Sequence, residues 1–347
     1  MSTQVELEIR EQPQALARTL EAARGAAADL AREVRRRGIE WVMIAARGTS
    51  DHAAVYAAYL LAAFNGLPVS LATPSLYTWY RKPPRLASAL VLGISQSGQS
   101  EDVVEVLAEA RRQGALTAAV TNEPGSPLAG HADHVLALAT GPERAVAATK
   151  TYTSTLAALA LLSAELEQDA DRLDWLARLP GIAADTLAQC AERATAAVQA
   201  HAGMERCVIL SRGFNYATAM EIALKMKELA YVTTVPYSSA DFMHGPVAIL
   251  EPGYPVLLVA PAGEMAGQLA ALVPGLRERG AEILAIGNSA EVLDAPVEPL
   301  PIAPAIPEWL SPVAAVLPGQ LLAVGLAAAK GHDPDRPRGL SKVTVTR

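Results

Sequence analysis

The sequence predicts an α/β protein of two tandem domains, each a mostly parallel sheet flanked by helices on both faces. The chain repeats itself at an offset of about 165 residues: the block from Trp41 to Leu60 parallels the block from Cys207 to Met226, and residues 111–122 parallel residues 277–288. The first block in each half runs from an apolar strand through Arg-Gly into an Ala-rich helix. Apolar strands that alternate with crossover helices indicate a parallel sheet covered on both faces.

The elements outside the repeat complete the predicted order. We expect a helix from about Gln14 to Arg37 and a helical bridge from about Thr151 to His201. The polar, Pro-rich tail ends in Val-Thr-Val-Thr, residues 343–346, which could pair as an edge strand. The predicted boundaries are a helical arm (1–38), a first domain (39–170), a helical linker (171–203), a second domain (204–330) and a tail that closes the site (331–347).

Composition favours a cytoplasmic enzyme. With 347 residues and 51% hydrophobic content, the chain can bury two cores, and a net charge of -7 argues against a nucleic-acid partner. The only two cysteines, Cys190 and Cys207, lack the spacing of a disulfide framework or zinc site. The N-terminus carries charges where a signal peptide would be apolar. We expect no membrane span, because residues 53–64 are too few and residues 313–329 are interrupted by Pro318, Gly319 and Gln320; both predict buried helices.

A serine-rich loop in the first half is the candidate phosphate site. The stretch from Ser95 to Ser100 follows an apolar strand and leads into a helix, so hydroxyls and amides converge at a helix N-terminus. It matches neither a Walker A loop nor a dinucleotide fingerprint, which favours a small phosphorylated metabolite. The alternative is a serine N-cap, with Glu101 and Asp102 satisfying the helix dipole. The corresponding loop of the second half, residues 261–266, has no hydroxyl cluster, so we expect one phosphate site per chain.

Three charged residues of the second half follow helical spacing. Glu221, Lys225 and Glu228 fall at i, i+4 and i+7 on an otherwise apolar helix that begins just after the strand ending at Arg212-Gly213. Ligands in parallel sheets bind beyond the carboxyl ends of the strands, so a carboxylate there is placed for proton abstraction. A solvent-facing Glu–Lys pair is the alternative.

Further candidates are two histidines and a tail lysine. His244 stands before Gly245-Pro246, where we expect a helix to stop and a turn to enter an apolar strand; it suits acid–base chemistry, although most single histidines are structural or exposed. His52, near Arg47-Gly48, could touch the same ligand. Lys342 is a solvated tail residue unless something folds over it.

At this point the motifs identify a family. The segments ARGTSDHA, SQSGQSED, PERAVAATKTYTSTL, AMEIALKMKELAY, HGPVAIL and PRGLSKVTV occur in the order found in two consecutive sugar isomerase (SIS) domains, and the chain resembles the isomerase portion of glucosamine-6-phosphate synthase. The resemblance implies Glu228 as the base between C1 and C2, His244 as the ring-opening residue, and Lys342 as the Schiff-base lysine. It also implies a set of substrate-binding residues: Gly48, Thr49, Ser50, Ser95, Gln96, Ser97, Ser100, Val146, Glu221, Lys225 and Ser341.

Departures from that family pattern direct the functional prediction. The synthase begins with a Cys-initiated glutaminase domain, whereas this sequence has Ser2 and starts its isomerase portion early, so we expect it not to take ammonia from glutamine by itself. Arg47 stands where the family commonly has Cys, and Gln99 where it has Glu, which suggests a more positive anion pocket. Stand-alone proteins of this kind include glucosamine-6-phosphate deaminases and fructosamine-phosphate deglycases.

The predicted function is deamination of glucosamine 6-phosphate to fructose 6-phosphate and ammonia, with no cofactor and no metal, since no His, Cys or carboxylate cluster has ligand spacing. The resemblance implies a homodimer with shared active sites. Amine formation from free ammonia or a partner glutaminase, deglycation, and a non-catalytic sugar-phosphate-binding regulator stay open as alternatives.

Overall fold

The structure, a computed structural model, describes residues 2–342 and divides the chain into two compact units, each built on one sheet. The sheet A unit comprises residues 12–143 and 150–180 together with Ser341 and Lys342. The sheet B unit comprises residues 2–11, 144–149 and 181–340. The predicted α/β fold with two parallel sheets is confirmed, and each unit is described by itself below.

Sheet A has five parallel strands in the order β2-β1-β3-β4-β5. They are β1 (Trp41–Ala45), β2 (Val69–Leu71), β3 (Ala89–Ile94), β4 (Leu116–Thr121) and β5 (His134–Ala137). Every residue of β3 and β4 is buried, as expected of strands covered on both faces. From β1 the chain adds β2 on one side, and it then adds β3, β4 and β5 in turn on the other side. The direction of strand addition therefore reverses between β1 and β3, which is the topological switch point of the sheet.

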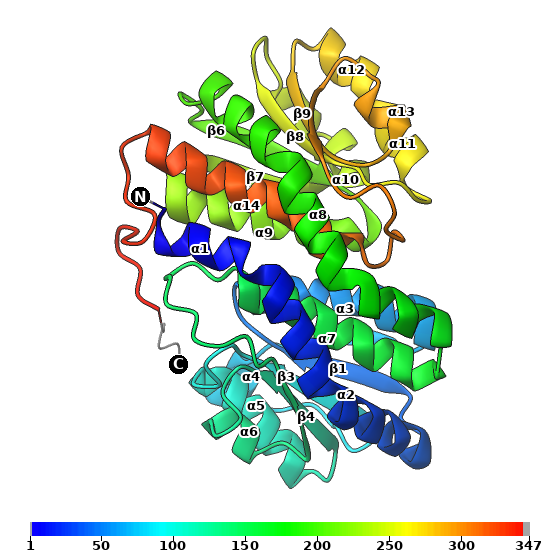
Figure 1. Cartoon of the computed structure of the whole chain (residues 1–347). Coiled ribbons are helices and arrows are strands. Elements are labelled where there is room, and N and C mark those ends of the chain that lie inside the picture. The colour runs from blue at the N-terminus through cyan, green and yellow to red at the C-terminus, as the bar shows by residue number, and fades with distance from the viewer. Residues whose placement is uncertain (1, 343–347) are drawn as a thin grey trace. The chain divides into compact units, whose positions relative to one another are not determined.

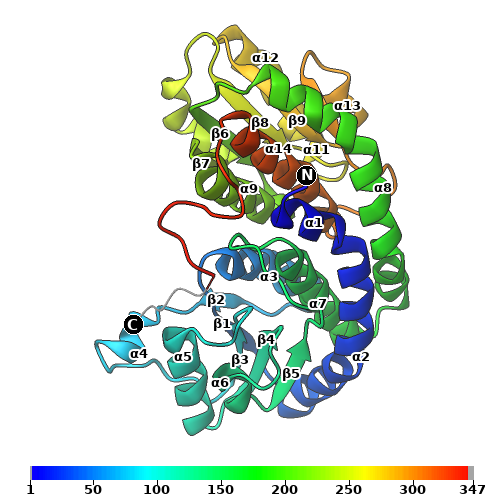
Figure 2. The same ribbon diagram turned by 60° about the vertical axis from the view of Figure 1, so that its left-hand side comes forward.

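Helices cover both faces of sheet A (Figure 2). One face is covered by α4 (Ser75–Thr78), α5 (Glu101–Arg112) and α6 (Pro127–Gly130), and the other by α2 (Gln12–Arg37), α3 (Thr49–Asn65) and α7 (Lys150–Glu167). On the first face, Val103 and Leu107 of α5 pack with Val91 of β3 in one buried cluster. These packed faces fix where the loops at the ends of β1 and β3 emerge.

Sheet B repeats the topology of sheet A. Its parallel order is β10-β9-β8-β6-β7, which is the order of sheet A when β6 to β10 are matched with β1 to β5. The strands are β6 (Arg206–Ser211), β7 (Thr233–Ser238), β8 (Pro255–Val259), β9 (Glu282–Gly287) and β10 (Glu298–Pro301). The internal repeat of the sequence is therefore a repeat of strand order.

Helices also cover both faces of sheet B (Figure 1). A cluster that includes Phe242, Leu269 and Val292 buries one face of the sheet. That face carries α10 (Ser239–Met243), α11 (Ala266–Ala270), α12 (Leu272–Glu278) and α13 (Ala290–Leu293). The other carries α9 (Tyr216–Ala230), which follows the short 3-10 helix η1 (Gly213–Asn215), and α14 (Ser311–Ala329).

The most apolar helix, α14, is continuous through Pro318 and Gly319, and 78% of its most apolar window is buried within the structure. By length and composition it is the one helix of the described residues that could cross a membrane. A Cβ at Gly319 would lie 2.4 Å from the Ile222 side chain, so the glycine permits close contact between α14 and α9. The predicted helix over residues 53–64 lies within α3.

The helical segments outside the repeat divide more finely than the sequence suggested. The N-terminal segment forms α1 (Gln4–Arg10) and α2, and the bridge forms α7 and α8 (Ala170–Ala200). Because Asp335 accepts the backbone N–H groups of Gln4 and Val5, α1 is held within the sheet B unit. The division between the units falls inside α8, after Pro180. The predicted edge strand at residues 343–346 lies outside the described residues.

One expected strand is wrong. The apolar run after Gly245 forms a second 3-10 helix, η2 (Pro246–Ile249), and β8 begins only at Pro255. Pro246 occupies the first turn, where its missing N–H costs nothing, and the side chain of Ile249 is exposed. Four apolar residues in a row were too short a pattern to distinguish a strand from a helical turn.

Candidate functional site

The serine loop of sheet A connects β3 to α5. The hydroxyl oxygens of Ser95 and Ser100 lie 3.3 Å apart, and the backbone N–H of Gly98 donates to Ser95 Oγ at 3.2 Å. The Gln99 N–H donates to Ser97 Oγ at 3.3 Å. Ser100 occupies the N-cap position of α5, but its hydroxyl accepts no hydrogen bond from the amides of that helix. Helix capping therefore does not account for the cluster of hydroxyls.

Glycine and the end of β4 fix the shape of this loop. Gly98 has φ +61°, and a Cβ there would lie 2.0 Å from Ser126 Oγ. The carbonyl of Gln96 accepts hydrogen bonds from the Thr121 hydroxyl at 3.2 Å and the Asn122 N–H at 3.1 Å. The loop is thus held by its neighbours in one conformation, with the side chains of Gln96 and Ser97 half-buried.

A second loop emerges at the same edge of sheet A, because β1 and β3 are adjacent parallel strands. Gly48, with φ +54°, precedes α3, whose first residues are Thr49 and Ser50. Strand pairs at a switch point open a crevice beyond their carboxyl ends, where ligands of such sheets bind. The sheet A unit therefore brings the predicted Gly48–Ser50 and Ser95–Ser100 segments to one edge of the sheet.

The charge of Arg47 is offset by a neighbouring carboxylate. Its Nε lies 2.6 Å from Oδ2 of Asp102, whose side chain is only 2% exposed. The sequence suggested that Arg47 makes the anion pocket more positive. The structure instead shows an ion pair, so Arg47 and Asp102 together add no net charge.

The helix α9 of the sheet B unit carries a buried charged triad. Lys225 Nζ lies 2.6 Å from Glu228 Oε2 and 3.4 Å from Glu221 Oε1. The side chains of Glu221 and Lys225 are buried, whereas that of Glu228 is 22% exposed. Burial disfavours the ammonium, but the two carboxylates outweigh it and raise the pKa of Lys225 above its ordinary value.

The burial of this triad decides between the two interpretations of its sequence pattern. The alternative of a solvent-facing Glu–Lys pair is wrong, because the side chains of Glu221 and Lys225 are buried from solvent. Two carboxylates and one ammonium leave the triad with one net negative charge. Glu228 is the member that a ligand can reach, and it is held in place by an ammonium that stays charged.

The two histidines have different settings. His244 ends α10 and is exposed, with its backbone N–H donating to the Asp241 carbonyl. Within the described residues its imidazole makes no hydrogen bond, so the structure does not join it to the triad. His52 is half-buried in the first turn of α3, where its N–H donates to the Gly48 carbonyl.

The tail lysine meets a carboxylate that the sequence analysis did not single out. Lys342 Nζ lies 2.9 Å from Oε2 of Glu143, whose side chain is fully buried in the sheet A unit. Lys342 is therefore not the solvated residue of the alternative interpretation. Glu143 stands in the PERAVAATKTYTSTL segment, three residues before Val146, so its place in a family motif was the available signal.

The remaining predicted residues, Val146 and Ser341, are at least partly exposed. Val146 is half-buried in a segment of the sheet B unit whose Arg144 and Ala145 N–H groups donate to the buried carboxylate of Glu8. Ser341 is exposed beside Lys342. Burial raises the pKa of the Cys207 thiol to about 12, which makes it a poor nucleophile at neutral pH.

Comparison with known proteins places these features in context. The family model described as the SIS domain matches residues 37–164 and 202–293. A glutamine–fructose-6-phosphate aminotransferase (isomerizing) of Symbiobacterium thermophilum is 37% identical over 97% of the chain and 58% of that protein. The chain spans about half the length of the curated relatives it matches.

Two solved structures are similar along their whole length. A protein from Silicibacter pomeroyi named a phosphosugar isomerase has a TM-score of 0.87 and 34% identity, over 96% of this chain and 100% of that one. The C-terminal domain of glucosamine–fructose-6-phosphate aminotransferase from Francisella tularensis has a TM-score of 0.86 and 27% identity, over 97% and 99%. These proteins share the fold of this chain over nearly all of its length.

Proposed function

We propose, from the premise that the chain belongs to the SIS domain family, that it isomerises and deaminates an amino sugar phosphate. The proposed substrate is glucosamine 6-phosphate, and the products are fructose 6-phosphate and ammonia. The family and its relatives support sugar phosphate isomerisation. Loss of the amine is the finer step of the proposal, and it follows from the chemistry at C2 once isomerisation begins.

The observation that carries the proposal is the buried triad of α9. Isomerisation needs one base that removes the proton from C2 of the open-chain aldose and delivers it to C1. Glu228 suits this task because it is partly exposed, while its hydrogen bond from Lys225 fixes its position. When the proton reaches C1, the C2 amine becomes an imine, water adds to C2, and ammonia leaves. Glu221 keeps the buried Lys225 charged throughout.

The other predicted residues receive supporting roles. The hydroxyls and amides of the Ser95–Ser100 loop, together with Thr49 and Ser50, would bind the phosphate group, and the closeness of the Ser95 and Ser100 hydroxyls supports this role. The exposed His244 would open the pyranose ring, because imidazole exchanges protons near neutral pH. Lys342 would condense with the open-chain ketose as an iminium.

The direct test is incubation of the purified protein with glucosamine 6-phosphate while ammonia and fructose 6-phosphate are measured. We expect both products in equal amounts without added cofactor, and the same yield after treatment with a chelator. A panel of amino sugar phosphates and fructosamine phosphates then separates deamination from deglycation. A protein that binds these sugars but releases no ammonia from any of them contradicts the proposal and favours a regulator.

The opposite direction is the second candidate function. Its support is the similarity to aminotransferases, which are named for amine transfer to fructose 6-phosphate. The same residues would act in reverse order, with free ammonia or a partner glutaminase as the nitrogen source. Net synthesis of glucosamine 6-phosphate from fructose 6-phosphate and an ammonium salt, at a rate above deamination, would favour this direction.

Assembly and setting belong to the same proposal. We infer a cytoplasmic homodimer in which His244 serves the site of the neighbouring chain, with no nucleic-acid or membrane partner. Mixing Glu228→Gln protein with His244→Ala protein should then restore activity through hybrid dimers. Confirmed subunit exchange without any recovered activity would return His244 to the site of its own chain.

A further inference from the structure

We propose that Glu143 is the proton acceptor and donor for Lys342 during formation of the iminium. This inference rests on the proposed function, since it assumes that Lys342 condenses with a ketose phosphate. Glu143 has no part in the isomerisation carried by α9. It would instead carry protons to and from the tail lysine, a task for which the sequence pattern offered no residue.

The position of the carboxylate supports this role. Glu143 Oε2 lies 2.9 Å from Lys342 Nζ, which is the distance of a direct proton transfer. The same oxygen accepts a hydrogen bond from the Thr151 hydroxyl at 2.7 Å, while Oε1 accepts the Thr151 backbone N–H at 3.1 Å. Glu143 is therefore a buried carboxylate with fixed orientation, and Lys342, at 25% exposure, is the end of the pair that is open to solvent.

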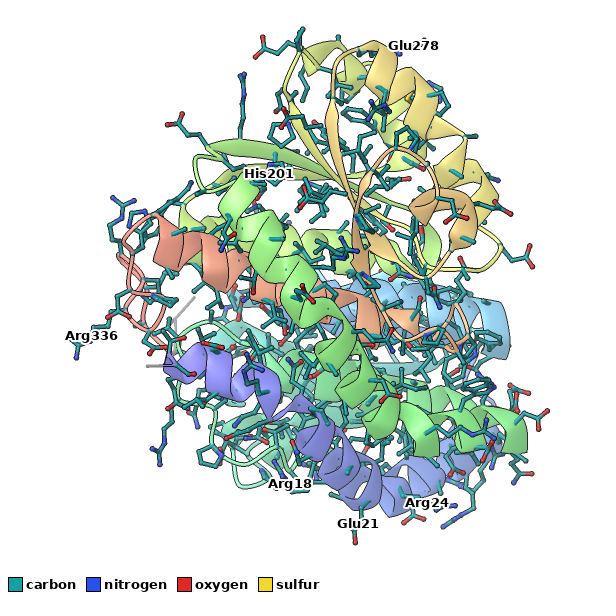
Figure 3. All side chains as sticks on the ribbon, turned by 45° about the horizontal axis from the view of Figure 1, so that its top comes forward. Arg18, Glu21, Arg24, His201, Glu278 and Arg336 are labelled. Atoms are coloured by element: carbon teal, nitrogen blue, oxygen red, sulfur yellow. The ribbon has the colours of Figure 1, made fainter. Side chains whose placement is uncertain are left out.

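The segment before Glu143 is braced on several sides. Arg18 of α2, labelled in Figure 3, donates to the carbonyls of Ala139 and Thr140. Lys150 Nζ donates to the Pro142 carbonyl at 2.9 Å. These hydrogen bonds hold the segment that carries Glu143, and with it the carboxylate that Lys342 contacts. A preorganised acid–base group is what proton transfer requires.

The chemistry needs one group that takes a proton and returns it. An ammonium has no lone pair, so Lys342 must first give one proton to Glu143. The amine then bonds to C2 of the ketose, and a second proton moves from nitrogen to the C2 oxygen, which becomes a hydroxyl. Glu143 returns its proton to this hydroxyl, water leaves with the electrons of the C–O bond, and the iminium forms. Ammonium and ketone give iminium and water, and Glu143 ends as a carboxylate.

The test measures the adduct at Lys342 directly. Each variant is mixed with fructose 6-phosphate, quenched with borohydride at increasing times, and analysed by peptide mass spectrometry. Glu143→Gln keeps the shape and can still accept the Thr151 N–H, but it cannot take up a proton. We expect adduct formation to slow by about 100-fold, the usual worth of a positioned acid–base group. Glu33→Gln, a surface change on α2, should form the adduct at the wild-type rate.

A second arm separates proton transfer from simple anchoring of the tail. In Glu143→Ala, formate should enter the vacated space and restore adduct formation in proportion to its concentration, whereas chloride should not. Should that variant not fold, Glu143→Asp replaces it and should retain more activity than Glu143→Gln. Solvent hydrogen exchange at C2 of glucosamine 6-phosphate depends on Glu228 and should stay unchanged in every Glu143 variant.

The outcomes are distinguishable. Adduct formation at the wild-type rate in Glu143→Gln overturns the role of Glu143 and leaves the proposed function standing. A slow Glu143→Ala protein that does not respond to formate also overturns it, because only anchoring is then lost. A wild-type protein that releases ammonia but forms no adduct overturns the condensation at Lys342 and this inference with it. Neither ammonia nor adduct from the wild type refutes the proposed function itself.

Discussion

The loop after β3 and the loop after β8 occupy equivalent places in two sheets of the same strand order, yet their amides donate to different groups. In sheet A, the loop amides of Gly98 and Gln99 donate to the hydroxyls of Ser95 and Ser97. A serine hydroxyl can rotate and donate its own proton to a ligand. In sheet B, the Glu264 N–H donates to the carboxylate of Glu308 at 2.7 Å. That loop is already filled by an anion of its own chain.

The helices that follow β1 and β6 also differ, but here it is the sheet B unit that carries the polar residues. The buried face of α3 consists of alanine, leucine and Tyr56, whereas the buried face of α9 includes Glu221 and Lys225. A repeated fold has therefore specialised in complementary ways: sheet A has an open hydroxyl loop and an apolar helix, and sheet B has a closed loop and a charged helix. Such differences matter because function resides in site residues rather than in a shared fold.

The largest effect should come from removing the proposed base on α9. Glu228→Gln should lower solvent hydrogen exchange into the sugar by about 10³-fold, because the amide cannot accept the C2 proton. Nuclear magnetic resonance of glucosamine 6-phosphate in deuterium oxide measures this exchange. Glu278→Gln, at the surface of α12 (Figure 3), is the control and should exchange normally. Comparable exchange in both variants would mean that Glu228 is not the base, and the charged residues of α9 would then have no chemical role that α3 lacks.

The next effect concerns the stability of the charged helix. Lys225→Met should lower the free energy of unfolding by about 3 kcal/mol or more, because it leaves buried Glu221 without its counterion. Lys227→Met, at an exposed position of α9, should change it by less than about 0.5 kcal/mol. Urea denaturation of both variants and the wild type provides the comparison.

The pH dependence of this difference follows from the raised pKa of Lys225. A group whose pKa is higher in the folded state contributes its full stabilisation below its unfolded value of 10.5 and loses it as pH rises through the folded value. The stability difference between wild type and Lys225→Met should therefore not shrink between pH 7 and pH 9. A difference that disappears by pH 9 would mean that the ammonium is not held by its carboxylates.

A matched pair of glycine substitutions compares the two loops directly. Gly98→Ala and Gly263→Ala each place a Cβ at positive φ, 2.0 Å from Ser126 Oγ and 2.4 Å from Glu308 Oε2 respectively. Each should cost about 1–3 kcal/mol of stability from backbone strain. Only Gly98→Ala should also raise KM, by about tenfold or more, since it distorts the open loop. An equal rise in KM for Gly263→Ala would mean that the closed loop also contacts substrate.

The smallest effect is expected for the two equivalent arginines. Arg47→Ala removes the partner of buried Asp102 and should cost about 1 kcal/mol, reduced by the half-exposed position of the arginine. Arg212→Ala breaks an exposed hydrogen bond to Gln268 and should cost less than about 0.5 kcal/mol. Thermal denaturation of the two variants and the wild type measures both losses of stability. A larger loss for Arg212→Ala would reverse the expected order.

The sequence by itself determined the fold class, the repeat and the placement of the serine loop. Strand and helix periods are local properties, and parallel strands with crossover helices leave few possible topologies, so the two-sheet architecture could be inferred from patterns. Motif order identified the family. The boundaries of short elements were less predictable, and η2 appeared where a strand was expected, because a run of four apolar residues satisfies either conformation.

Only the tertiary structure decided which charged residues are buried and paired. The spacing of Glu221, Lys225 and Glu228 fits a solvated face as well as a buried triad, and nothing local fixes which face of α9 meets α14 and sheet B. The contact between Glu143 and Lys342 joins residues 199 positions apart, beyond any local pattern. Burial and long-range pairing depend on how elements pack, and packing energies arise from neighbours that are distant in sequence.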